Sequence, residues 1–191
     1  LDGLPGGLDA ELGPAGAGLL LYGKQIVVGC AQLIGFLRRI EFPHLVNALA
    51  SPGQNVMRSV LSTQRRGAQA ALVSAGLVLV GGLATYALSE GDLHPAGLAA
   101  ALFAPMIVSS AYNLAFLQGL AAQERFKAAA MVSGLEVVAS LAFLGLACIA
   151  PSLFAFAAAD LMANIVSSLL AAYVLVRPAR SQPSRRPCFA S

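Results

Sequence analysis

Five long apolar stretches constrain this chain more than any other feature of its sequence. Each of them carries at most one Asp, Glu, Lys or Arg, and they cover residues 15–37, 67–88, 96–117, 128–149 and 152–176. The hydrocarbon core of a bilayer is ~30 Å thick and is crossed by ~20 helical residues, so each stretch is long enough to span it. The sequence therefore predicts an all-α fold, a polytopic bundle of five transmembrane helices.

The segments between these stretches alternate in charge. Eleven of the twelve Lys and Arg residues lie in every second connection, namely in residues 38–66, 118–127 and 177–191. The other connections carry acids, which are Asp2, Asp9, Glu11, Glu90 and Asp92. Because cytoplasmic loops are enriched in Lys and Arg, the pattern predicts a multi-pass protein of the cell inner (cytoplasmic) membrane. Its N-terminus is expected outside and its C-terminus in the cytoplasm.

This alternation also divides the chain into segments. We expect an outer leader over residues 1–14, a transmembrane domain over 15–176 and a disordered basic tail over 177–191. Residues 38–66 are expected to form an amphipathic cytoplasmic loop that begins with a kinked interfacial stretch around Pro43. A break at residues 51–53 and a second amphipathic helix over 54–66 complete this loop.

Composition excludes several classes of protein. With 58% hydrophobic and 11% charged residues, the chain cannot present a water-facing surface of ordinary polarity. The net charge of +3 resides at the predicted membrane borders, so it does not indicate a nucleic-acid partner. The chain has no dinucleotide-binding, phosphate-loop or zinc-protease motif and no paired Cys/His spacing. We expect a protein that is not an enzyme, has no cofactor beyond a possible coupling Na⁺ or H⁺, and contacts membrane lipids.

Three charges lie inside the predicted spans: Lys24, Glu136 and Asp160. Counted along helices at ~1.5 Å per residue, all three fall close to the midplane of the membrane. A charge at this depth costs several kcal/mol unless it is paired or hydrated, and it marks an internal cavity or an ion path by default. The alternative is a structural Lys–carboxylate pair that ties two helices together. One cation does not balance two acids, which leaves a negative charge for a proton, Na⁺ or a cationic ligand.

Polar side chains accompany these charges at helical spacing, which favours a water-filled interior. Oxygen-rich neighbours suit a hard cation such as Na⁺ better than a transition metal. The polar sets are Tyr22, Gln25 and Gln32 in the first span, Ser109, Ser110, Tyr112 and Asn113 in the third, Ser133 and Ser140 around Glu136, and Asn164, Ser167 and Ser168 after Asp160.

Two segments resemble a known family. The run Leu12-Gly13-Pro14 with Tyr22 and Lys24, followed by Phe42-Pro43-His44-Leu45, resembles the "LG…G.Y..A..I…FP.L" stretch that opens the C-terminal lobe of polysaccharide flippases. These flippases belong to the multidrug/oligosaccharidyl-lipid/polysaccharide exporter superfamily. Residues 117–127 are similar to the family's cytoplasmic "L.ALGR.K" connection.

This resemblance implies an incomplete C-terminal lobe, matched to the last five spans of a two-lobe flippase. The implied function is to flip a lipid-linked oligosaccharide, an O-antigen or other polysaccharide precursor, across the cytoplasmic membrane by ion-coupled alternating access. The implied partner is the missing N-terminal lobe or a partner membrane subunit. Alternatives are a multidrug or lipid II exporter of the same superfamily and a non-transporting scaffold subunit. A membrane enzyme is disfavoured, because the longest loop offers only Glu41 and His44 for acid–base chemistry.

The resemblance also implies roles for individual residues. In related lipid II flippases, carboxylate and amide groups of the last two spans build a sodium site, and similar regions here hold Glu136, Asp160 and Asn164. We expect these three to bind the coupling ion. Lys24 is expected to meet the anionic pyrophosphate of the substrate. The predicted substrate-binding set is Lys24, Gln25, Gln32 and Asn113.

Overall fold

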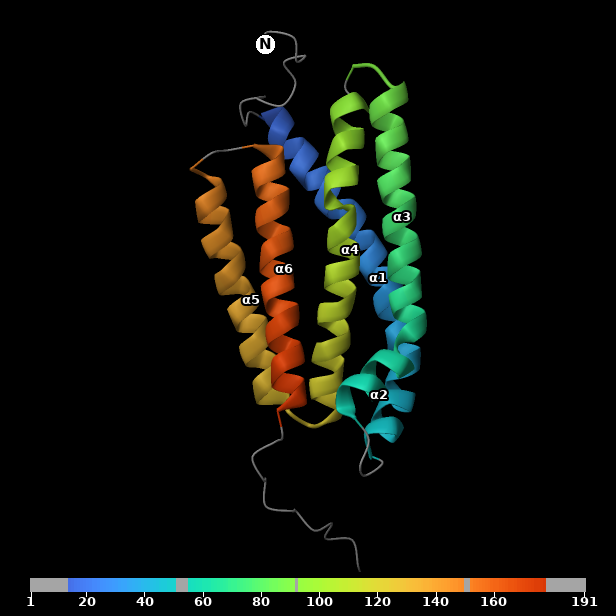
Figure 1. Ribbon diagram of the computed structural model, residues 1–191. Helices are drawn as coiled ribbons and strands as arrows, with labels where there is room; N and C mark the ends of the chain where they lie inside the picture. Colours follow the sequence, from blue (N-terminus) through green and yellow to red (C-terminus); the bar gives the residue numbers. More distant parts are fainter. Residues whose placement is uncertain (1–13, 51–54, 92, 150–151, 178–191) are drawn as a thin grey trace, which may run out of the picture.

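The computed structural model describes residues 14–50, 55–91, 93–149 and 152–177 (Figure 1). The expected leader, the tail beyond Arg177, the break at 51–53 and the turn at 150–151 lie outside these residues. Six helices make up the described chain: α1 (Pro14–Ala50), α2 (Val56–Thr63), α3 (Arg65–Leu88), α4 (Leu93–Ala122), α5 (Phe126–Ala147) and α6 (Leu153–Val176).

The predicted all-α class is confirmed. Five of the six helices are long and apolar enough to cross a membrane, and only α2 is too short. The helices α3 to α6 begin and end within five residues of the predicted second to fifth spans. By helix length and hydropathy, the chain is a multi-pass membrane protein.

The first helix differs from its predicted span. α1 continues past residue 37 and through Pro43 to Ala50, so it is 37 residues long, or ~55 Å. Figure 1 shows it crossing obliquely behind α4. Residues 38–50 are thus the last turns of α1, and α2 and the start of α3 complete the segment expected as a loop. Burial explains the extension, because Leu45 packs in a core cluster with Val60 of α2 and Leu120 of α4.

α4 is the central helix of the bundle. It packs against α1, α3 and α6, while α5 lies at one side and packs mainly against α6 (Figure 1). Small residues permit this close packing in a membrane, where helix association depends on van der Waals contact. Close approach joins α3 and α4 at Gly82 and Gly97, where an added Cβ would lie under 3.0 Å from backbone atoms of the other helix. Phe103 of α4 similarly fills the space over Gly23 of α1.

Charge is distributed unequally between the two ends of the bundle. The start of α1 and the α3–α4 connection lie at one end, where the described charge is Glu90. α2, the α4–α5 connection and the end of α6 lie at the other end (Figure 1). The cations near that second end are Arg38, Arg39, Arg58, Arg65, Arg66, Arg125, Lys127 and Arg177. The charge rule for cytoplasmic loops therefore predicts that this basic end faces the cytoplasm.

Cysteine accessibility tests this orientation. In a background with the native cysteines replaced by alanine, we expect Glu90→Cys to react with a membrane-impermeant maleimide in intact cells. Arg58→Cys should react only after the cells are permeabilised, because α2 lies at the basic end. Labelling of position 58 in intact cells would reverse the proposed orientation.

Candidate functional site

An ion pair inside the bundle joins α1 to α6. The Nζ atom of Lys24 lies 2.7 Å from Oδ2 of Asp160. The Asp160 side chain is 16% exposed, whereas the Lys24 side chain is 50% exposed. Lys24 follows Gly23, the residue at which α1 packs closely on Phe103 of α4. The structure therefore forms the Lys–carboxylate pair that the sequence offered as one alternative, with the cation still open to its surroundings.

A polar seam continues from Asp160 along the contact of α6 with α4. The Nδ2 atom of Asn164 donates to the backbone oxygen of Asp160 at 3.1 Å. Its Oδ1 atom accepts from the Ser110 hydroxyl at 3.2 Å. One turn further, the Ser168 hydroxyl donates to the backbone oxygen of Ser109 at 3.3 Å. The amide and hydroxyl groups of this seam thus bind one another and the helix backbone.

Glu136 of α5 forms a second polar contact. Its Oε2 atom accepts hydrogen bonds from Nδ2 of Asn113 on α4 at 2.8 Å and from the Ser167 hydroxyl on α6 at 3.1 Å. Asn113 and Ser167 are buried, and Glu136 is partly buried. This carboxylate is therefore satisfied by amide and hydroxyl donors from two neighbouring helices.

The two acids do not share one contact. Glu136 is bonded to Ser167, which follows Asp160 by seven residues, or ~10 Å along α6. The predicted coupling group of Glu136, Asp160 and Asn164 is thus spread over two contacts connected through α6. Asn113, which was grouped with Lys24, Gln25 and Gln32 as a substrate ligand, is placed with Glu136 instead. The functional roles of all these residues stay predictions.

One face of α1 is open and carries polar groups. Gln25 and Gln32 are exposed, and Gln32 follows Lys24 by eight residues, which places both on the same side of the helix. A groove of about 620 Å³ runs beside this face. It is lined by Val28, Ala31, Gln32, Gly35, Phe36 and Arg39.

A buried arginine was missed at the sequence level, where Arg38 was interpreted as a charge at the membrane border. Arg38 is fully buried, and its Nη1 atom donates to Oε1 of Gln64 at 2.7 Å. Nε2 of Gln64 donates in turn to Oε1 of Gln118 on α4 at 2.8 Å. Gly67 makes room for the arginine, since a Cβ there would lie 3.1 Å from its Cγ and Nε atoms.

Helical spacing carried a signal for this burial. The buried positions of α1 recur at intervals of three, four or seven residues: Gly23, Val27, Ile34, Arg38, Glu41 and Leu45. These intervals keep the six residues on one face of the helix. Continuing the buried face of the first span past residue 37 would therefore have placed Arg38 inside the bundle.

Comparisons with protein-family models, curated proteins and solved structures find no match to this chain. Within the described ranges, no cluster of three or more His, Cys, Asp or Glu side chains could hold a metal ion. The geometry of the chain itself thus carries the functional argument.

Proposed function

We propose that this chain is part of a membrane transporter that flips a lipid-linked oligosaccharide across the cytoplasmic membrane by ion-coupled alternating access. The open face of α1 would line the translocation path. The observation that carries this proposal is the half-exposed side chain of Lys24, whose ammonium group pairs with Asp160 in a transmembrane bundle.

The cost of exposing charge and amides to hydrocarbon supports a path along α1. A cation near the bilayer centre costs several kcal/mol when it faces lipid, so the face with Lys24 favours water, a polar ligand or a second protein surface. The outward face of α3 beyond Gln69 gives the contrast, because its large exposed side chains are apolar, among them Leu72, Leu77 and Val80. We assign the α3 face to lipid and the α1 face to the path.

The groups along α1 suit a substrate that combines an anion, a sugar and a prenyl chain. An ammonium group has three donors, and the pair with Asp160 leaves others for a pyrophosphate oxygen. The exposed amides of Gln25 and Gln32 can donate to and accept from sugar hydroxyls. Val28 and Phe36, which line the adjacent groove, offer apolar contact to a prenyl chain.

Ion coupling follows from competition for Lys24. When an anionic substrate draws the ammonium away, Asp160 loses its counter-charge, and a coupling cation, Na⁺ or H⁺, can replace it. Asn164 lies one turn along α6 from Asp160 and holds a further oxygen atom together with its partner Ser110, and Glu136 is the second acid of the same bundle. Binding of the ion and of the substrate would thus be linked, while no covalent bond changes.

A translocation path along α1 needs a second surface opposite this helix. In two-lobe flippases of the kind that this chain resembles, the N-terminal lobe supplies this second surface. A separate membrane subunit could supply it in the same way. A multidrug or lipid II exporter would use the same open face for a different ligand. These related functions differ in the substrate that Lys24, Gln25 and Gln32 contact.

Site-specific photo-crosslinking tests the proposal. A photoreactive amino acid is placed at Gln32 or, as the control, at Leu77 on the apolar face of α3, in membranes that contain a radiolabelled prenyl-pyrophosphate oligosaccharide. We expect position 32 to capture at least about fivefold more label than position 77, which corresponds to a preference of ~1 kcal/mol. Equal capture at both positions would contradict a substrate path and favour the scaffold alternative.

A further inference from the structure

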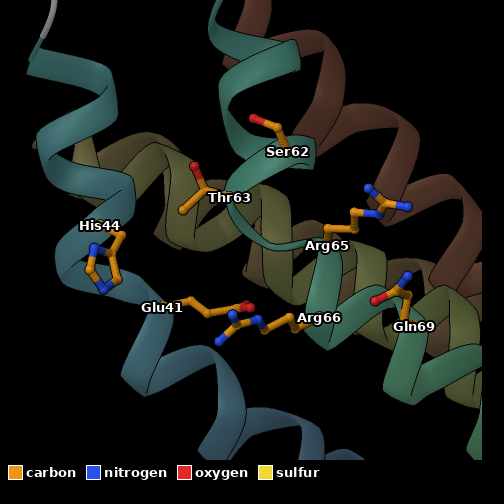
Figure 2. A pocket seen from close by; sticks show the side chains of 7 residues that line it. All are labelled: Glu41, His44, Ser62, Thr63, Arg65, Arg66 and Gln69. Carbon is orange, nitrogen blue, oxygen red and sulfur yellow. The ribbon is translucent and has the colours of Figure 1, made fainter.

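A second pocket lies at the basic end of the bundle, apart from the Lys24–Asp160 pair. It occupies about 530 Å³ between the last turns of α1 and the junction of α2 with α3 (Figure 2). Cationic and hydroxyl groups line it, including Arg65, Arg66 and Thr63, and Glu41 adds a carboxylate. Figure 2 shows the ends of the Glu41 and Arg66 side chains pointing toward each other.

We propose that this pocket binds the headgroup of a membrane phospholipid that carries both a phosphate and a primary amine. The function proposed for α1 does not depend on this site. This assignment rests on the position of the pocket at the basic end, on its two arginines and on the Glu41 carboxylate, whose Oε2 atom has no hydrogen-bond partner.

The position of the pocket fits a lipid headgroup. Arg65 is the first residue of α3, a 24-residue helix of ~36 Å that is long enough to cross the hydrocarbon core. Its first turn therefore lies at the level of the headgroups when the helix spans the membrane. Arg65 and Arg66 are exposed at that level, where phosphates are the predominant anions.

The arginines and hydroxyls supply the phosphate half of the site. A guanidinium group is planar and can donate two parallel hydrogen bonds to phosphate oxygens. Thr63 adds a hydroxyl group that lies on α2, the neighbouring element. The site thus presents donors from two helices to one anionic group.

Glu41 supplies the group that would bind the amine of the headgroup. Its side chain is 7% exposed, and its buried Oε2 atom has no hydrogen-bond partner. The Arg38 guanidinium interacts electrostatically with Glu41 without a hydrogen bond to Oε2, because its Nη1 atom donates to Gln64 and its Nε atom has no hydrogen-bond partner. A buried acceptor without a donor is costly, and a small shift of the Glu41 side chain toward the pocket would let a ligand ammonium donate a charge-assisted hydrogen bond to it.

The combination favours a zwitterionic headgroup over a purely anionic one. A ligand with negative charge alone would be attracted by Arg65 and Arg66 and repelled by Glu41. A headgroup with a phosphate and an ammonium places each of its charges opposite a protein group of the other sign. Phosphatidylethanolamine has this chemistry.

A series of three lipids with identical acyl chains tests the proposal. Phosphatidylethanolamine has an ammonium with three N–H donors, phosphatidylcholine keeps the phosphate and the positive charge without any N–H donor, and phosphatidylglycerol has no amine. Binding to the purified 191-residue chain in detergent is measured by native mass spectrometry. We expect phosphatidylethanolamine to bind about tenfold more tightly than either of the others, the effect of one charge-assisted hydrogen bond.

Variants separate the two halves of the site. Glu41→Gln keeps the side-chain volume and should reduce the preference for phosphatidylethanolamine to less than about twofold. Arg66→Ala should weaken all three lipids by about tenfold. Arg58→Ala removes an exposed cation of α2 that does not line the pocket, and it should leave all three affinities unchanged.

Three results would overturn the proposal. Equal binding of phosphatidylethanolamine and phosphatidylcholine to the unaltered chain would exclude recognition of the amine. An equal loss in Arg58→Ala and Arg66→Ala would indicate attraction to the basic end as a whole. Displacement of the lipid by inorganic phosphate as effectively as by glycerophosphoethanolamine would indicate a site for free phosphate. Because Glu41 is buried, the lipid series and Arg66→Ala decide the question even if Glu41→Gln does not fold.

Discussion

Replacing Gly97 by alanine is expected to destabilise the bundle by about 2–4 kcal/mol, because the contact of α3 with α4 leaves no room for a side chain. A Cβ at Gly97 would lie 2.5 Å from the backbone nitrogen of Tyr86 and 2.7 Å from the backbone oxygen of Gly82. Backbone atoms of a helix cannot rotate away as a side chain can. The two helices must therefore separate, and α4 then loses contacts at the centre of the fold.

Two neighbouring glycines on α3 provide a matched comparison. A Cβ at Gly82 would lie 2.7 Å from the backbone oxygen of Gly97, whereas a Cβ at Gly81 would have nothing within 4 Å. Gly82→Ala should thus be destabilising, and Gly81→Ala should be neutral or stabilising by up to ~1 kcal/mol, because alanine is the better helix former. Thermal unfolding in detergent measures all three variants. If Gly97→Ala and Gly82→Ala are as stable as Gly81→Ala, α3 and α4 do not cross at these glycines.

Membrane thickness explains why much of the fold was predictable. The apolar stretches must match the hydrocarbon core, and their ends carry charges or turn residues, so the sequence fixes the lengths of α3 to α6 within a few residues. Ser152 illustrates the local precision, since its hydroxyl accepts a hydrogen bond from the Ala155 backbone nitrogen and caps the start of α6. No tertiary information is needed for these features.

The extension of α1 required tertiary information. Proline disfavours a helix interior, and Pro43 was interpreted as the place of a kink. In the structure Pro43 is exposed, while Leu45 and Arg38 anchor the same turns against α2, α4 and Gln64. Gln64 is 26 residues from Arg38, and Gln118 is 54 residues from Gln64, so no local pattern pairs them. The rule that cytoplasmic loops are rich in Lys and Arg uses only the position along the chain, and it therefore assigned Arg38 to the membrane border.

The depth of the candidate site residues in the membrane was predictable from the sequence. The neighbours that their side chains face were less so. Counting along helices placed Lys24 and Asp160 at a similar level, and the structure joins them directly. The same counting placed Glu136 near this level too, yet Glu136 binds Asn113 and Ser167. The sequence states how far a residue lies along its helix, but packing decides which neighbour it faces.

Large effects on stability and function are expected when Lys24 and Asp160 are replaced, first one at a time and then together. Lys24→Met leaves the carboxylate of Asp160 mostly buried without its counter-charge, and we expect a loss of about 2–4 kcal/mol in stability. Asp160→Leu leaves a lysine whose side chain is already half exposed and can be hydrated, so its cost should be smaller, about 1–2 kcal/mol. Lys127→Ala, at an exposed position in the first turn of α5, is the control and should change stability by less than ~0.5 kcal/mol.

The double variant Lys24→Met/Asp160→Leu separates structure from function. Two apolar side chains of similar size avoid the desolvation cost of both charges, so thermal unfolding should return to within ~1 kcal/mol of the unaltered chain. Photo-capture of the lipid-linked oligosaccharide from position 32 should nevertheless fall at least about tenfold, because the cation that meets the pyrophosphate is gone. A double variant that is stable and still captures the substrate at the original level would make the pair a structural tie between α1 and α6. In that case the half-exposed side chain of Lys24 would need a different polar neighbour, and we would expect it on the second surface opposite α1.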